Sequence, residues 1–147
     1  MVNNTVKELK LRINSLSFDD IASLAEVLSS NSTLQTISFS SFVTLKDEES
    51  VLFFTAISNN LKISKIDLYG IDLHNSNSNT VVSLLQSSSL ESIKFPTNYH
   101  LDSTAVNSLK NNSSLKEITI PGYAFTSEDL ADVLQFNTFL KKLEISG

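Results

Sequence analysis

The sequence predicts an α/β fold of repeated units, with about five strand–loop–helix units and a final strand in one domain over residues 1–147. Three observations predict it. The pattern apolar-x-x-apolar-x-apolar occurs six times, at intervals of 28, 29, 27, 25 and 25 residues. Each interval holds apolar residues at helical spacing. Finally, no unit can bury its apolar face alone, so neighbouring units are expected to stack into a solenoid.

Each occurrence of the pattern predicts one strand, because apolar residues alternate along its second half. The strands are expected within residues 6–11, 34–39, 63–68, 90–95, 115–120 and 140–145. Right-handed strand–helix–strand crossovers place consecutive strands parallel and side by side. The middle apolar residues should then form one row across the sheet: Leu9, Ile37, Ile66, Ile93, Ile118 and Leu143.

Five helices are expected between these strands. Each places an apolar residue six positions before the next unit, and these residues are Leu28, Ile57, Leu84, Leu109 and Leu134. Capping boxes predict three helix starts, at Ser17-x-x-Asp20, Thr44-x-x-Asp47 and Thr126-x-x-Asp129. Asp102 is expected to cap the fourth helix, and the polar run before Thr80 predicts a late start for the third.

The helix ends carry a polar residue three positions before each new unit. These residues are Asn31, Asn60, Ser87, Asn112 and Asn137. Asn replaces Gly in the left-handed conformation that ends many helices. The sequence therefore predicts left-handed Asn residues at these ends, which would explain how the chain folds with only three glycines.

The composition excludes several classes of protein. The chain has no cysteine, so disulfides, thiolate metal sites and cysteine nucleophiles are excluded. Its net charge of −5 argues against general nucleic-acid binding. No apolar run is long enough to span a bilayer, so no membrane insertion is expected. No secretory signal is visible either, and we expect an intracellular, cytoplasmic location.

Two segments resemble leucine-rich repeats of the ribonuclease-inhibitor-like subtype. Residues 21–34 read IASLAEVLSSNSTL and residues 130–140 read LADVLQFNTFL. The resemblance implies a parallel sheet on a concave face and helices on a convex face. It also implies an Asn three residues after each strand; Asn14 and Asn98 match this position, whereas Phe42, Ile71 and Tyr123 do not.

The side chains that alternate with the buried strand residues should point away from the helices. The candidate protein-binding surface on this face consists of Tyr69, Pro96, Pro121, Lys65, Asp67 and Lys94. An aromatic residue among mixed charges is a common arrangement for a binding hot spot. A solvated face that binds nothing is the alternative, and we expect a non-enzymatic protein–protein interaction module.

No catalytic residue, cofactor or metal ion is expected. His74 and His100 follow neighbouring strands near Asp72 and Asp102, but loop residues of this kind usually face water. Arg12 is the only arginine and belongs to no motif. Besides partner binding, the resemblance implies a second possible role, regulation of a GTPase or ubiquitin pathway.

The ends of the repeat predict a third role, a structural or assembly component. No polar cap is visible at either end, which is expected of a segment of a longer solenoid or of one whose ends dock on another chain. The apolar residues expected at the C-terminal end are Phe136, Phe139, Leu140 and Leu143. The sequence therefore predicts self-association through this end.

Overall fold

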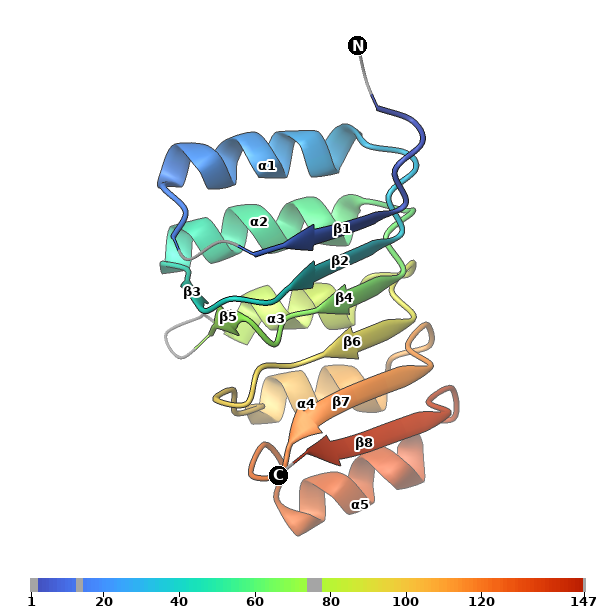
Figure 1. The fold of residues 1–147 in the computed structure, drawn as a ribbon. Coiled ribbons are helices and arrows are strands. Elements are labelled where there is room, and N and C mark those ends of the chain that lie inside the picture. The colour runs from blue at the N-terminus through green and yellow to red at the C-terminus, as the bar shows by residue number, and fades with distance from the viewer. Residues whose placement is uncertain (1–2, 13–14, 74–77, 147) are drawn as a thin grey trace.

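Six strands form one parallel sheet, and five helices cover one of its faces in the computed structural model, which describes residues 3–12, 15–73 and 78–146 (Figure 1). The strands lie side by side in chain order. They are β1 (Glu8–Leu11), β2 (Thr36–Phe39), β4 (Lys65–Asp67), β6 (Ser92–Lys94), β7 (Glu117–Pro121) and β8 (Lys142–Ser146). The helices are α1 (Phe18–Ser30), α2 (Asp47–Asn59), α3 (Ser78–Leu85), α4 (Ser103–Lys110) and α5 (Ser127–Phe136). The prediction of an α/β fold with a parallel sheet is confirmed.

The register of the sheet also follows the prediction. Leu9 pairs with Ile37, and the row continues through Ile66, Ile93, Ile118 and Leu143. Each position of the repeat therefore lies beside the same position of the next unit. Every outward-facing residue has an equivalent outward neighbour on the adjacent strand.

The core lies between the sheet and the helix layer. Ile37, Phe53 and Phe54 are almost completely buried there. The Phe53 ring meets the rings of Phe39 and Phe54 edge-on, with centroids 5.4 and 5.3 Å apart. Each large apolar side chain buried in this way contributes about 1.5–3 kcal/mol to folding. Since the core is filled, the chemistry open to other molecules lies on the outward faces.

A second, two-stranded sheet extends the strand ends and was not predicted. Strand β3 (Val43–Thr44) pairs in parallel with β5 (Ile71–Asp72). This pairing corrects one predicted helix start, because Thr44 is held in an extended strand. Helix α2 instead begins after Lys46, whose N–H donates to the Glu49 carboxylate at 2.8 Å. The capping boxes at Ser17 and Thr126, and the Asp102 cap, are confirmed.

The Asn residues at the helix ends do not adopt the predicted left-handed conformation. Asn31, Asn60 and Asn137 have φ between −82° and −75°, and the described residues contain no positive φ. Their side chains organise the loop instead. The Asn60 Oδ1 accepts the N–H groups of Lys62 and Ile63, at 2.8 and 3.2 Å.

The same side chain links neighbouring units. Asn60 Nδ2 donates to the carbonyls of Leu28 and Asn31 in the preceding unit, at 2.6 and 2.8 Å. Asn137 repeats the arrangement with Leu109 and Asn112, at 2.6 and 3.3 Å. These asparagines satisfy backbone carbonyls at the end of the preceding helix, which would otherwise lack a partner.

One glycine is required by the close approach of two units. A Cβ on Gly70 would lie 2.5 Å from the Ser41 carbonyl oxygen and 2.8 Å from the Phe39 carbonyl carbon. The Gly70 N–H donates to the Phe39 carbonyl at 3.1 Å, which holds the chain against the preceding strand. Gly70 thus sets how closely the turn after β4 packs on the turn after β2.

Candidate functional site

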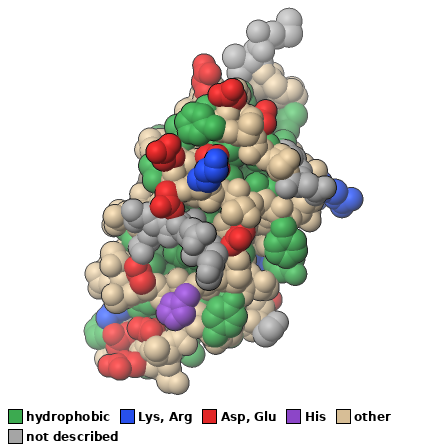
Figure 2. Space-filling view, turned by 90° about the vertical axis from the view of Figure 1, so that its left-hand side faces the viewer, with side chains coloured by type: hydrophobic (Ala, Val, Ile, Leu, Met, Phe, Trp, Pro, Cys, Tyr) green, Lys and Arg blue, Asp and Glu red, His purple; other side chains and the backbone are tan. Residues whose placement is uncertain are grey.

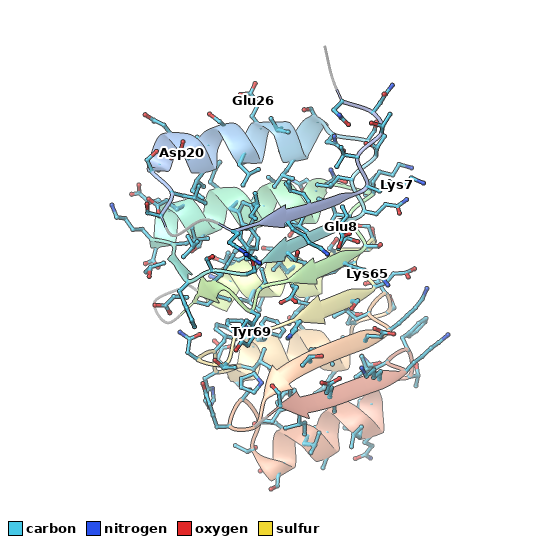
Figure 3. The ribbon with its side chains drawn as sticks, viewed as in Figure 1. Lys7, Glu8, Asp20, Glu26, Lys65 and Tyr69 are labelled. Carbon is cyan, nitrogen blue, oxygen red and sulfur yellow. The ribbon has the colours of Figure 1, made fainter. Side chains whose placement is uncertain are left out.

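The sheet face opposite the helices carries a groove of about 390 Å³ that crosses all six strands. Its walls are mostly the outward side chains of the strands, and Figure 3 shows Glu8 and Lys65 on this layer. The polar and charged lining residues are Glu8, Lys10, Thr36, Ser38, Lys65, Asp67, Ser92, Lys94, Glu117, Thr119 and Lys142. A surface assembled from every unit is the natural candidate for a binding site.

The groove is zwitterionic, because four lysines and three acidic residues line it. One ion pair joins neighbouring strands, with Lys94 Nζ 3.9 Å from Asp67 Oδ2, as predicted. Glu117 and Lys142 also lie side by side, on β7 and β8. Lys142 lies 2.8 Å from Glu144 on its own strand, and this contact lowers the pKa of Glu144.

Tyr69 forms a small cluster with two of these charges at the end of β4. The Lys94 Nζ lies 4.8 Å from the centre of the Tyr69 ring, within range of a cation–π interaction. The Tyr69 N–H donates to Asp67 Oδ1 at 2.9 Å, so Asp67 holds both the backbone of Tyr69 and the Lys94 ammonium group. The Tyr69 side chain remains 45% exposed, and Lys65 is exposed nearby on the same strand. The structure thus brings Tyr69, Asp67 and Lys94 into contact, whereas Lys65 lines the same groove at the start of β4.

The two prolines predicted for this surface are buried, so that part of the prediction is wrong. Each strand that ends in proline is followed by a tight turn that folds back over it. The Pro96 carbonyl accepts the Tyr99 N–H at 3.3 Å, and the Tyr99 ring stacks on Phe95 with centroids 5.4 Å apart. The Pro121 carbonyl accepts the Ala124 N–H at 2.9 Å. Neither proline can contact a partner on the outer face.

The apolar residues predicted for the C-terminal end are only partly open. Phe139 is exposed, whereas Leu140 and Leu143 are half-buried. Phe136 is also exposed, although Lys110 Nζ on the preceding helix lies 4.9 Å from its ring centre. The sequence did not single out Leu134 and Ile145 as exposed, although both are, at 63% and 47%.

A larger hollow of about 670 Å³ lies where α1 and α2 begin. Phe18 and the acidic first turn of α2 line it, and Figure 2 shows acidic side chains on this side of the molecule. These carboxylates have a structural explanation, since they lie at the positive ends of helices and Glu49 caps its own helix. We therefore place the candidate site in the strand groove.

The histidines and carboxylates that the sequence places near one another do not form a metal site in the described residues. These residues contain no group of three His, Asp or Glu side chains that could hold a metal ion. His100 is exposed, while His74 and Asn14 lie outside the described residues. Asn98, which matches the Asn position that the resemblance implies, donates its Nδ2 hydrogen to Asp72 Oδ1 at 2.6 Å. Burial, aided by the nearby Asp102 charge, raises the pKa of Tyr99 to about 12, so this phenol stays protonated at neutral pH.

None of the helices in the part of the chain that the structure describes is long and apolar enough to cross a membrane. No protein-family model matches the chain, and no curated protein matches it. The site is therefore interpreted from its own geometry and chemistry.

Proposed function

We propose that this chain is a short leucine-rich-repeat solenoid that binds a protein partner in the strand groove and does not catalyse a reaction. The observation that carries the proposal is a groove lined by outward side chains from all six strands. Each strand is tied to the next by backbone hydrogen bonds in one register. The side chains are therefore held in place before a partner arrives, which lowers the entropy cost of binding.

The chemistry of the groove favours a partner that carries both charge signs. From strand to strand across the groove, the outward lysines alternate with carboxylates. A partner segment with a single sign of charge would therefore meet repulsion as well as attraction. Tyr69 supplies the aromatic anchor, and Lys94 and Asp67 fix its position. Tyr69 lies beside the groove, against its lining residues Lys94 and Asp67. We infer that Tyr69 contributes more binding energy than any single side chain that lines the groove.

The test begins with crosslinking and affinity capture from native cells, using the wild-type chain as bait and the Tyr69→Ala and Lys94→Glu variants in parallel. Two substitutions serve as matched controls. Tyr123→Ala removes another exposed tyrosine, and Lys62→Glu reverses an exposed lysine in the loop that precedes β4.

The captured partner is then titrated against each variant by calorimetry. Tyr69→Ala should weaken binding by about 1–2 kcal/mol without changing the unfolding midpoint, because its ring is largely exposed. The two controls should bind as the wild type does. If Tyr69→Ala and Lys94→Glu both bind the partner with the affinity of the wild type, the proposal is contradicted.

Cytoplasmic location and a role in a GTPase or ubiquitin pathway remain predictions from the sequence. The assembly role has more support, because the charges and apolar residues of the two outer strands, β1 and β8, are complementary.

A further inference from the structure

The two outer strands of the sheet, β1 and β8, each pair with a neighbour on one side only. At every junction inside the sheet, the same backbone contact recurs. The carbonyl before one strand accepts two N–H groups from the start of the next strand; at the last junction, Lys116 accepts from Lys141 and Lys142, at 2.8 and 2.9 Å. The Lys141 carbonyl is the next acceptor in this series, and the N–H groups of Lys7 and Glu8 are the matching donors. An edge of this kind is a template for a further strand.

The side chains of the two edges are complementary in the register that continues the sheet. Adding one more rung beside β8 places Lys142 next to Glu8, and Glu144 next to Lys10. On the opposite face, the same rung places Leu143 next to Leu9. Opposite charges therefore meet at both outward positions of the junction, and two leucines meet at the inward position.

The loop that precedes each strand shows the same match. Asn3 occupies in the first unit the position that Asn60 occupies in the third, and its Oδ1 accepts the N–H groups of Thr5 and Val6, both at 3.0 Å. Asn60 and Asn137 use their Nδ2 atoms to bond carbonyls of the preceding unit. The described residues include no unit before Asn3. At the other edge of the sheet, the carbonyls of Leu134 and Asn137 are the equivalent acceptors.

The helix layer completes the correspondence. Leu134 on α5 is 63% exposed, whereas its equivalent Leu109 is fully buried against the next unit. Val27 on α1 is 58% exposed, whereas its equivalent Ala56 is 5% exposed. One apolar residue on each outer helix therefore lacks the neighbour that every inner helix has.

From these matches we propose that the chain assembles head to tail, with β1 of one copy joining the sheet beside β8 of another. The ion pairs within each edge strand, Glu8–Lys10 at 3.3 Å and Lys142–Glu144 at 2.8 Å, are exchanged for pairs between the copies. Leu134 and Val27 become buried at the same junction. Each added copy leaves one β1 edge and one β8 edge open, so the assembly grows into chains.

Charge exchange within one edge tests the register directly. The β1 variant is Glu8→Lys with Lys10→Glu, and the β8 variant is Lys142→Glu with Glu144→Lys. Both keep the net charge and the pair within the strand, so both should fold and unfold as the wild type does. A control exchanges Glu91 and Lys116, an ion pair at 2.6 Å whose two residues lie outside both edge strands.

Mass is measured by sedimentation velocity from about 10 µM to about 1 mM, the range in which weak association falls. The wild type and the control should associate, with a mass that rises past that of a dimer. Each single-edge variant should associate about tenfold more weakly or worse, because two attractive pairs become two repulsive ones. An equimolar mixture of the β1 and β8 variants should associate again and grow past a dimer. Wild-type edges meet at one junction, and the exchanged charges of one variant face the exchanged charges of the other at the next.

Three results would overturn the proposal. A wild type that remains monomeric over the whole range leaves these edges to a different protein. Association that survives the β1 exchange and stops at a dimer indicates antiparallel pairing of two β8 strands. Failure of the mixture to associate, with both variants folded, shows that the charges do not define the register.

Discussion

The inner and outer units of this protein contain the same repeat but differ in what the repeat buries. Leu109 on α4 and Leu134 on α5 occupy equivalent positions, six residues before the next strand pattern. Leu109 is fully buried, and Leu134 is 63% exposed. The difference arises because the following helix packs against α4, whereas no helix follows α5 among the described residues. Burial at this position is therefore a property of the neighbouring unit.

The edges of the sheet differ from its interior in the same way. Inside the sheet, Lys94 reaches Asp67 on the adjacent strand. At the edges, Lys10 and Lys142 reach carboxylates on their own strands. Both lysines take a partner two residues away on the same strand, and such a partner is easily exchanged because exposed pairs contribute only about 0–1 kcal/mol.

The largest expected effect separates the two leucines. Leu109→Ala should lower the free energy of unfolding by about 2–5 kcal/mol, because it leaves a cavity between α4 and its neighbours. Leu134→Ala should change the stability of the monomer by less than about 0.5 kcal/mol, since its side chain is mostly in water. Urea unfolding at low protein concentration measures both. Equal losses would show that α5 is more tightly packed than its exposure indicates.

The next comparison concerns the asparagines. Asn60→Ala should cost about 2–3 kcal/mol, because the loop N–H groups and the carbonyls of Leu28 and Asn31 lose their partner together. Asn3→Ala should cost less than about 1 kcal/mol, because Asn3 is exposed and bonds only within its own loop among the contacts described here. The measurement is again urea unfolding, and Asn60→Asp is a useful second variant. It keeps the acceptor but places a buried carboxylate oxygen against two carbonyl oxygens, so a loss at least as large as that of Asn60→Ala is expected.

A smaller effect is expected at the glycines. Gly70→Ala forces a Cβ into the backbone of the preceding turn and should cost about 1–3 kcal/mol. Gly122 lies beside the last strand, where a Cβ would be 3.5 Å from the Ser146 carbonyl oxygen, so Gly122→Ala should change stability by less than about 0.5 kcal/mol. Thermal unfolding of the two variants compares an inner turn with an outer one. A stable Gly70→Ala variant would mean that the turns after β2 and β4 separate easily.

Much of the strand layer could be predicted from the sequence, for a physical reason. Strand side chains alternate with a period of two, and the repeat fixes which residue faces its equivalent. The row from Leu9 to Leu143 and the outward position of Lys65, Asp67 and Lys94 follow from these two facts alone.

The remainder depends on contacts that no local pattern records. Every second residue of a strand faces outward, and this count places Pro96 and Pro121 on the outer face. The turns after the two prolines change the direction of the chain and cover them. Thr44 has a capping sequence, yet its pairing with Asp72 in β5 keeps it extended. Asn60 reads as a helix terminator, whereas its role is set by carbonyls 29 and 32 residues earlier in the chain. For Thr44 and Asn60, a neighbouring unit decides the outcome.

The smallest expected effect is the pH dependence of the two outer helices. Hydrogen bonds from Ser17 lower the pKa of Asp20, and those from Thr126 lower the pKa of Asp129, below the ordinary value of 3.8. The folded chain therefore binds fewer protons than the unfolded chain in acid. The stability from these two carboxylates is present above pH 3.8 and is lost as the pH falls through the lower folded values.

Asp20→Asn with Asp129→Asn should flatten the fall of the unfolding midpoint between neutral and acid pH, since neither Asn titrates. Asp19→Asn with Glu128→Gln makes the same charge change on the same helices without touching either capping bond, and it should keep the slope of the wild type. Circular dichroism melts along a pH series measure the slopes. Only the capping bonds require Asp20 and Asp129 in particular. Identical slopes in both double variants would therefore contradict the capping explanation. They would show that the total charge near the helix starts sets the acid sensitivity.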